Sequence, residues 1–130
     1  METQVHAEKE FLYKEITKEI IDSACCVQNY LGCGLLEKIY ENSLIRELEL
    51  RNKKAISQKE FKVNYREKEV GLYYADLIVE DKVIVEVKVV EEINNIHRAQ
   101  LINYLKISGL KVGLIINFYK PKIQYERLVV

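Results

Sequence analysis

The chain has 130 residues, of which 48% are hydrophobic and 31% are charged, and its formal net charge is +0. These values are ordinary for a folded globular domain and exclude a protein that coats nucleic acid through bulk positive charge. No apolar run approaches the ~20 residues that a membrane span needs, and the charged start of the chain lacks the apolar centre of a signal peptide. We therefore expect one domain over residues 1–130, located in the cytoplasm.

The first part of the chain predicts two amphipathic helices. Apolar residues recur every three or four positions from Glu8 to Leu31, which is the period of a helix with one buried face. Gly32 and Gly34 follow directly, and glycine is typical of a helix end. A second helix is predicted from about Leu36 to Arg51, where apolar residues recur at the same period.

The remainder of the chain predicts five strands and one further helix. The strands are expected at residues 57–65, 70–80, 83–90, 111–118 and 123–129. The third helix is expected from about Asn95 to Ser108, ending at Gly109. The resulting order is α-α-β-β-β-α-β-β, which indicates an α/β fold.

The strand at 83–90, with the sequence VIVEVKVV, carries two charged side chains on one face. Successive side chains of a strand alternate, so Glu86 and Lys88 point away from the face formed by its odd-numbered valines. A strand this apolar is typically covered on both faces. Charged groups there are costly unless they pair or bind an ion. A Glu–Lys pair of no chemical use and a functional site both remain open interpretations of this strand alone.

Asp76 in the preceding strand favours a functional site. A three-residue loop at 80–82 would pair Asp76 with Glu86, whereas a two-residue loop would pair it with Val87 and turn the acids apart. We therefore predict an odd loop or a β-bulge. Two adjacent carboxylates repel each other, and a divalent cation relieves the repulsion. Together with Lys88 they form a set that suits phosphodiester hydrolysis, because a metal activates water and a cation stabilises the developing charge.

Three motifs in this sequence resemble those of a known family. Asp76 followed by Glu86-Val87-Lys88 resembles the D…(D/E)-x-K signature of the PD-(D/E)XK nuclease superfamily. The segment 34–40, GLLEKIY, fits the G-x-x-E-x-x-Y motif of the GxxExxY proteins, a bacterial branch of that superfamily. Gln100-x-x-x-Tyr104 resembles the Q-x-x-x-Y helix motif of RecB-type nucleases. The resemblance extends over nearly the whole chain, in the family's order.

The resemblance implies a restriction-endonuclease-like core, with a central mixed β-sheet flanked by helices. It also implies a Mg²⁺ or Mn²⁺ site and roles for individual residues. Asp76 and Glu86 would be the main metal ligands, assisted by the backbone carbonyl of Val87. Glu37 would complete the site directly or through water, and it also counts among the catalytic groups. Lys88 would be the catalytic lysine.

The resemblance further implies that Gln100 and Tyr104 orient the site or the phosphate. Helix geometry independently places both on one face together with His97. Other interpretations of these motifs remain open. His97 is more often a structural histidine than a ligand, Tyr40 more often a packed core aromatic, and Glu37 also suits the dipole at a helix start.

The leading functional hypothesis is a metal-dependent nuclease that acts on nucleic acid, with DNA favoured over RNA. The alternative is a non-catalytic nucleic-acid-binding or protein-interaction module that keeps the nuclease fold. The net charge of +0 favours the module, and the full set of three acids and a lysine favours the enzyme. We expect no membrane partner, and a homodimer is compatible with the sequence.

Overall fold

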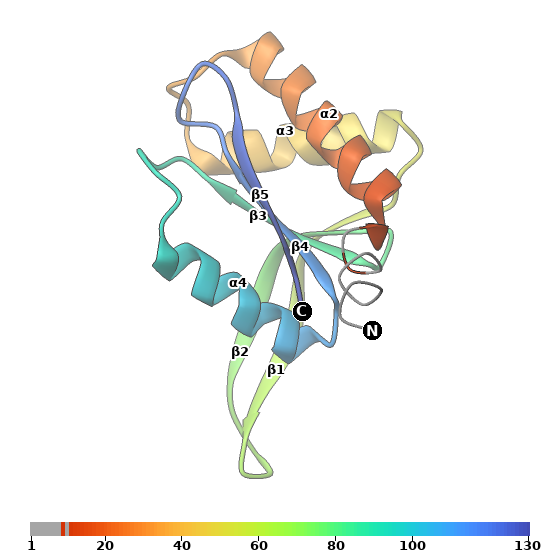
Figure 1. Ribbon diagram of the computed structural model, residues 1–130, viewed down its shortest axis with the longest axis vertical. Helices are drawn as coiled ribbons and strands as arrows, with labels where there is room; N and C mark the ends of the chain where they lie inside the picture. Colours follow the sequence, from red (N-terminus) through yellow and green to blue (C-terminus); the bar gives the residue numbers. More distant parts are fainter. Residues whose placement is uncertain (1–8, 10) are drawn as a thin grey trace.

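A computed structural model describes residue 9 and residues 11–130, and in it helices cover both faces of a five-stranded β-sheet (Figure 1). Two helices, α2 (Lys14–Leu31) and α3 (Glu37–Leu50), lie on one face. A third, α4 (Asn95–Ser108), lies on the other. In the part of the chain that the structure describes, no helix is long and apolar enough to cross a membrane.

The helix boundaries follow local backbone signals. α2 ends at Gly32, whose positive φ of 74° glycine adopts at low cost. α4 ends at Gly109, which has the left-handed helical conformation with φ 76°. The predicted start of the first helix was wrong. Tyr13 has a left-handed φ of 53°, so α2 begins at Lys14, and Glu8 lies outside the described residues.

All five predicted strands are present. Their bounds are β1 Ala55–Tyr65, β2 Lys68–Val79, β3 Val83–Lys88, β4 Val112–Asn117 and β5 Gln124–Val129. The sheet order is β1-β2-β3-β4-β5, and neighbouring strands are antiparallel except for the parallel pair β3–β4. A parallel pair needs a crossover connection, which α4 supplies. The expected α/β fold with a mixed sheet and the expected element order are confirmed.

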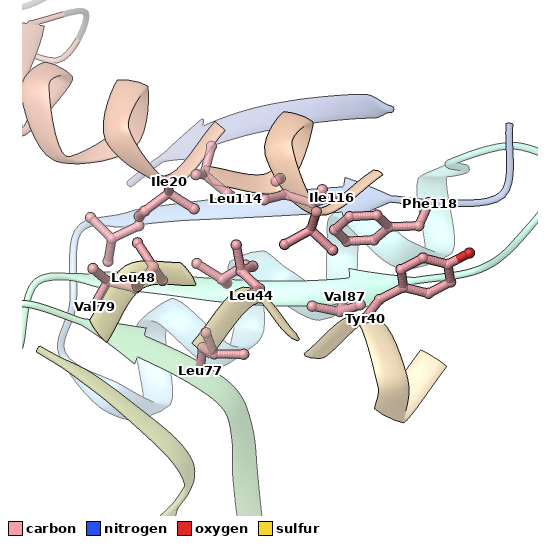
Figure 2. Close-up of a cluster of buried hydrophobic side chains, with 14 of the residues drawn as sticks. Ile20, Tyr40, Leu44, Leu48, Leu77, Val79, Val87, Leu114, Ile116 and Phe118 are labelled. Atoms are coloured by element: carbon pink, nitrogen blue, oxygen red, sulfur yellow. The ribbon is translucent and has the colours of Figure 1, made fainter. Parts of the chain in front are cut away.

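Two hydrophobic cores lie on opposite faces of the sheet. The first joins α2 and α3 to the sheet and includes Val83, Val85 and Val87, all fully buried. The second lies beneath α4 and includes Ile84. The alternation predicted for β3 is therefore present. Figure 2 shows the first core, in which aliphatic side chains of the helices meet those of β2, β3 and β4.

Tyr40 packs at one end of the first core, which agrees with its interpretation as a packed core aromatic. Its ring is fully buried and stacks on Phe118 with ring centroids 4.6 Å apart (Figure 2). Its hydroxyl donates to the carbonyl of Gly32 over 2.6 Å and accepts from the N–H of Leu35 over 3.3 Å. These two bonds hold the loop between α2 and α3, so Tyr40 fixes where α3 begins.

Candidate active site

The loop between β2 and β3 has the odd length that the sequence predicted. The ladder pairs Val79 with Val83 and Leu77 with Val85, so residues 80–82 form a three-residue loop. Glu80 and Asp81 adopt left-handed φ angles of 54° and 58° in it. Continued by one residue, this register sets Asp76 across from Glu86.

β2 and β3 part at Asp76. Their ladder ends at Leu77 and Val85, and the carboxylate of Asp76 accepts the N–H of Val87 over 3.0 Å. Backbone N–H groups of a strand lie in the plane of the sheet. The carboxylate of Asp76 therefore stands within that plane, between the two strands, and not on either face. We call this place the β2–β3 fork.

At the level of Asp76, the side chains of β1 and β2 switch from one face of the sheet to the other. In β2, Leu77 packs into the first core, whereas Ala75, also odd-numbered, packs into the second. A regular strand would keep both on one face. In β1, the residue across from Asp76 is Gln58, which has a φ of 54°. The ladder is regular on both sides of Gln58, where it pairs Ser57 with Leu77 and Lys59 with Ala75. The strand pair thus keeps its register while it changes the side on which its residues pack.

Glu86 lies on the α4 side of the fork and is only 7% exposed. Burial, the charge of Asp76 and a hydrogen bond with the Asp76 carboxyl group raise the pKa of Glu86 to about 8, against the smaller opposing effects of Tyr73 and Lys88. The hydroxyl of Tyr73 donates a hydrogen bond to Glu86 Oε1. Burial also raises the pKa of Asp76, although the N–H of Val87 and the hydrogen bond to Glu86 lower it. The raised pKa values mean that, when no cation is present, both carboxyl groups are protonated more readily than ordinary carboxyl groups.

Glu37 is the first residue of α3, and the motif around it has a clear local role. Gly34 has a φ of 99°, which glycine tolerates, and Tyr40 holds the loop, so the motif builds the start of the helix. Burial, Asp76 and Glu41 raise the pKa of Glu37. Lys88 and the N–H of Val89 lower it. These effects couple Glu37 electrostatically to the acids and the lysine of the fork.

Lys88 is the last residue of β3 and is half-buried. Its positive charge lowers the pKa of Glu37, of Asp76 and of Glu86. The four residues expected to carry the chemistry thus belong to one electrostatic network. Val87 takes part through its N–H, and the role of its carbonyl as a ligand stays a prediction.

The three motif residues of α4 are placed differently from one another. Tyr104 stacks on Tyr73 with ring centroids 3.8 Å apart, and burial followed by the charges of Glu86 and Asp76 raises its pKa. His97 accepts the N–H of Asn94 through Nδ1 over 3.1 Å as part of a capping box, which is the structural role. Gln100 is exposed on the same helix, and its place in the site stays a prediction.

Two groups of this network were missed by the sequence analysis. Glu41, one turn after Glu37, is only 3% exposed and accepts hydrogen bonds from Lys38 over 3.0 Å and from Gln58 over 2.9 Å. Its spacing from Glu37 on one helix face was a usable signal. Tyr73 gave no such signal, because the exchange of faces in β2 reverses the side to which a strand position points.

The donor set of the site suits a hard cation. Carboxylate and carbonyl oxygens are the ligands that Mg²⁺ prefers, and Mg²⁺ commonly uses only one or two carboxylates together with waters and substrate phosphates. Within residue 9 and residues 11–130, no group of three His, Cys, Asp or Glu side chains is arranged to hold a metal ion. The electrostatically coupled acids Asp76 and Glu86 therefore fit as a two-carboxylate site, with any further ligand reached through water.

Comparisons with known proteins agree with this fold. A family model described as the PD-(D/E)XK nuclease superfamily matches residues 14–128. The crystal structure of SSO0001 contains a similar chain, with a TM-score of 0.55 and 22% sequence identity, and the match covers 98% of this chain and 61% of that one. The present chain thus spans about three fifths of the length of that protein, and at this identity the likeness shows the fold alone. No curated protein matches the chain.

Proposed function

Because the chain belongs to the PD-(D/E)XK nuclease superfamily, we propose that it is a metal-dependent nuclease that hydrolyses phosphodiester bonds, in DNA in preference to RNA. The observation that carries the proposal is the electrostatic coupling of the half-buried Asp76 to the buried Glu86, in the range of Lys88. Two ionised carboxylates held close together repel each other, and a bound divalent cation relieves that repulsion.

Asp76, Glu86 and the carbonyl of Val87 would hold Mg²⁺ or Mn²⁺, and Glu37 would bind through water. A bound cation of this kind supplies an activated water and neutralises charge on the phosphate. Lys88 then donates hydrogen bonds to the attacking water or to the developing phosphate charge. Its ammonium has no lone pair, so it is not a ligand.

Gln100 and Tyr104 are proposed to orient the scissile phosphate from α4. The exposed amide of Gln100 is accessible to a substrate. Tyr104 acts from beside Glu86, because its ring stacks on Tyr73, whose hydroxyl is bonded to that carboxyl group.

We also propose that the chain belongs to the GxxExxY branch and that residues 1–130 form one domain. The branch is supported by the joint role of Gly34, Glu37 and Tyr40 in starting α3. The single domain is supported by one continuous sheet, whose five strands run from residue 55 to residue 129.

A non-catalytic module with the same fold is the second candidate. It is favoured by the net charge of +0, which gives little general attraction to nucleic acid. It is also favoured by the finding that, among the residues that the structure describes, no three metal-binding side chains are already in place.

One experiment separates the two candidates. The purified protein is incubated with single- and double-stranded DNA and RNA, with Mg²⁺, with Mn²⁺ and with EDTA. A nuclease cleaves at least one substrate only when a divalent cation is present, and Asp76→Asn abolishes the cleavage. Asp81→Asn is the matched control, because Asp81 lies five residues further along in the exposed loop and forms an ion pair with the surface residue Lys54. Binding without cleavage under every condition would favour the module.

A further inference from the structure

One hydrogen bond joins the helix of Glu37 to the strand that lies across from Asp76. Gln58 Nε2 in β1 donates to Glu41 Oε1 in α3 over 2.9 Å. Glu41 follows Glu37 by one helical turn, so both side chains project from the same side of the helix. Gln58 faces Asp76 between two ladder pairs of β1 and β2. The bond therefore spans the two elements that present Glu37 and Asp76.

Gln58 adopts a backbone conformation that its residue type does not favour. Its φ of 54° lies in the left-handed region, where a Cβ comes too close to the following carbonyl oxygen. Such strain persists only where the surrounding structure over-determines the conformation. Gln58 lies in the middle of a strand and not in a turn, at the level where the side chains of β1 and β2 switch from one face of the sheet to the other.

The buried carboxylate of Glu41 accepts hydrogen bonds from two side chains. It is 3% exposed, and Oε1 accepts from both Lys38 Nζ over 3.0 Å and Gln58 Nε2 over 2.9 Å. A buried carboxylate without donors is strongly unfavourable. The side chain of Lys38 is 58% exposed, so the screened ion pair contributes little, and the amide of Gln58 is the second donor to Glu41.

We propose that Gln58 and Glu41 are positioning residues, whose hydrogen bond sets the placement of Glu37 relative to Asp76. They touch neither substrate nor cation, and they act through the two acids. The consequence for metal binding rests on the proposed nuclease function. The geometric statement does not, because it concerns only the placement of two carboxylates in the folded chain.

Two backbone amides report the placement of those carboxylates without any metal. The N–H of Val87 donates to Asp76 over 3.0 Å. The N–H of Val89 lowers the pKa of Glu37, so this amide lies close to that carboxylate. Because each amide depends on one of the acids, hydrogen exchange at Val87 and Val89 measures whether the acids stay in place.

The first test is Gln58→Asn. Asparagine tolerates the left-handed region better than glutamine, and its side chain is one methylene shorter, so it does not reach Glu41. We expect a melting temperature close to that of the wild type, because relief of the left-handed backbone strain offsets the hydrogen bond lost to Glu41. Exchange at Val87 and Val89 should nevertheless become about tenfold faster, the size of one lost hydrogen bond. Mn²⁺ affinity should fall about tenfold, in the range seen when groups behind metal ligands are removed.

Glu67→Asn is the matched control. Glu67 has a φ of 68° in the exposed turn between β1 and β2, so the substitution makes the same backbone change away from the fork. It should leave exchange at Val87 and Val89 as in the wild type.

Glu41 provides a second pair of variants. Glu41→Gln keeps a carbonyl oxygen that accepts from Gln58, and it should retain wild-type exchange at the two amides. Glu41→Ala removes the acceptor and should reproduce the faster exchange of Gln58→Asn. A difference between these two variants assigns the effect to the hydrogen bond and not to the charge.

The outcomes are distinct. Unchanged exchange at Val87 and Val89 in Gln58→Asn overturns the positioning role. Exchange that accelerates equally at all amides of the sheet, with a lower melting temperature, also overturns it, because that result describes a purely structural residue. If the wild type neither binds Mn²⁺ nor cleaves nucleic acid, the proposed function fails, and the amide exchange still decides the positioning role.

Discussion

The backbone N–H of Val87 donates its hydrogen bond to the carboxylate of Asp76, over 3.0 Å, directly beyond the last ladder pair of β2 and β3. A side chain thus occupies the plane of the sheet where a neighbouring strand would otherwise lie. Residues from both faces meet there, because Glu37 comes from α3 on one side and Glu86 projects on the side of α4. The predictions below follow from this arrangement.

Lys88→Ala should lower the cleavage rate by about 10²–10³, the usual effect of losing a group that stabilises transition-state charge. Mn²⁺ affinity should change little, because a charged ammonium is not a ligand. Single-turnover rates and calorimetric Mn²⁺ titration measure the two quantities. Lys111→Ala, at an exposed position before β4, is the control. Cleavage by Lys88→Ala at the wild-type rate would end the catalytic assignment.

Glu86→Gln should weaken Mn²⁺ binding, because an amide oxygen is a poorer ligand than a carboxylate. The loss should be at least the ~10-fold that is typical when groups behind metal ligands are removed. Glu80→Gln, in the loop that follows β2, is the control for removing one negative charge. Equal Mn²⁺ affinities for the two variants would show that Glu86 does not bind the metal.

Glu86 should also make the stability of the metal-free protein depend on pH in an unusual direction. Its pKa is about 8 in the folded chain and about 4.3 in an unfolded one. The protonated form is therefore favoured by folding. Its stabilising contribution is complete below about pH 4.3 and is lost as the pH rises through about 8.

The test of this pH dependence compares wild type with Glu86→Gln in EDTA. All other titrating groups are shared, so the difference in melting temperature isolates Glu86. Glu86→Gln should gain stability relative to wild type as the pH rises from 5 to 9. Lys88→Ala should lower the melting temperature at neutral pH, whereas Glu86→Gln should raise it, because Lys88 supplies a charge that compensates the acids. A difference that does not vary with pH would contradict the raised pKa.

Tyr73→Phe should destabilise the protein by about 1–2 kcal/mol, the cost of leaving a buried polar group without its partner. The phenyl ring keeps the stacking on Tyr104, so only the hydrogen bond to Glu86 is lost. Tyr74→Phe is a close control, because Tyr74 is 47% exposed and its hydroxyl contacts Glu60 at 3.4 Å. Chemical denaturation of both variants gives the comparison, and equal losses would show that the bond to Glu86 contributes nothing.

Gly113→Ala should destabilise the fold by about 1–3 kcal/mol, as overpacking of a core does. A Cβ on Gly113 would lie 2.8 Å from Leu101 Cδ1, and Leu101 is a fully buried residue of α4. Gly71→Ala is the control, because nothing lies within 4 Å of its Cβ position. Thermal melting distinguishes the two. A Gly113→Ala protein as stable as Gly71→Ala would mean that α4 shifts freely on the sheet.

The features that the sequence predicted correctly depend on neighbours along the chain. The alternation of β3 follows from the period of a strand, and the end of α4 was predicted from Gly109. The odd loop after Val79 followed from requiring Asp76 and Glu86 to face each other. Local periodicity, loop length and glycine positions depend on residues that are close together in the sequence, so they can be inferred from a single sequence.

The sequence by itself determined the α/β fold, the order of its elements and which acids and lysine are candidates for chemistry. Only the tertiary structure decided that Asp76 stands in the plane of the sheet, that Glu41 is buried against Gln58 and that Tyr73 holds Glu86. Each of these depends on contacts between residues 11 to 17 positions apart, made where β1 and β2 exchange faces. Beyond such a point, strand alternation assigns each side chain to the wrong face of the sheet. The sequence does not reveal the switch, because the left-handed backbone of Gln58 arises from packing and not from any preference of glutamine.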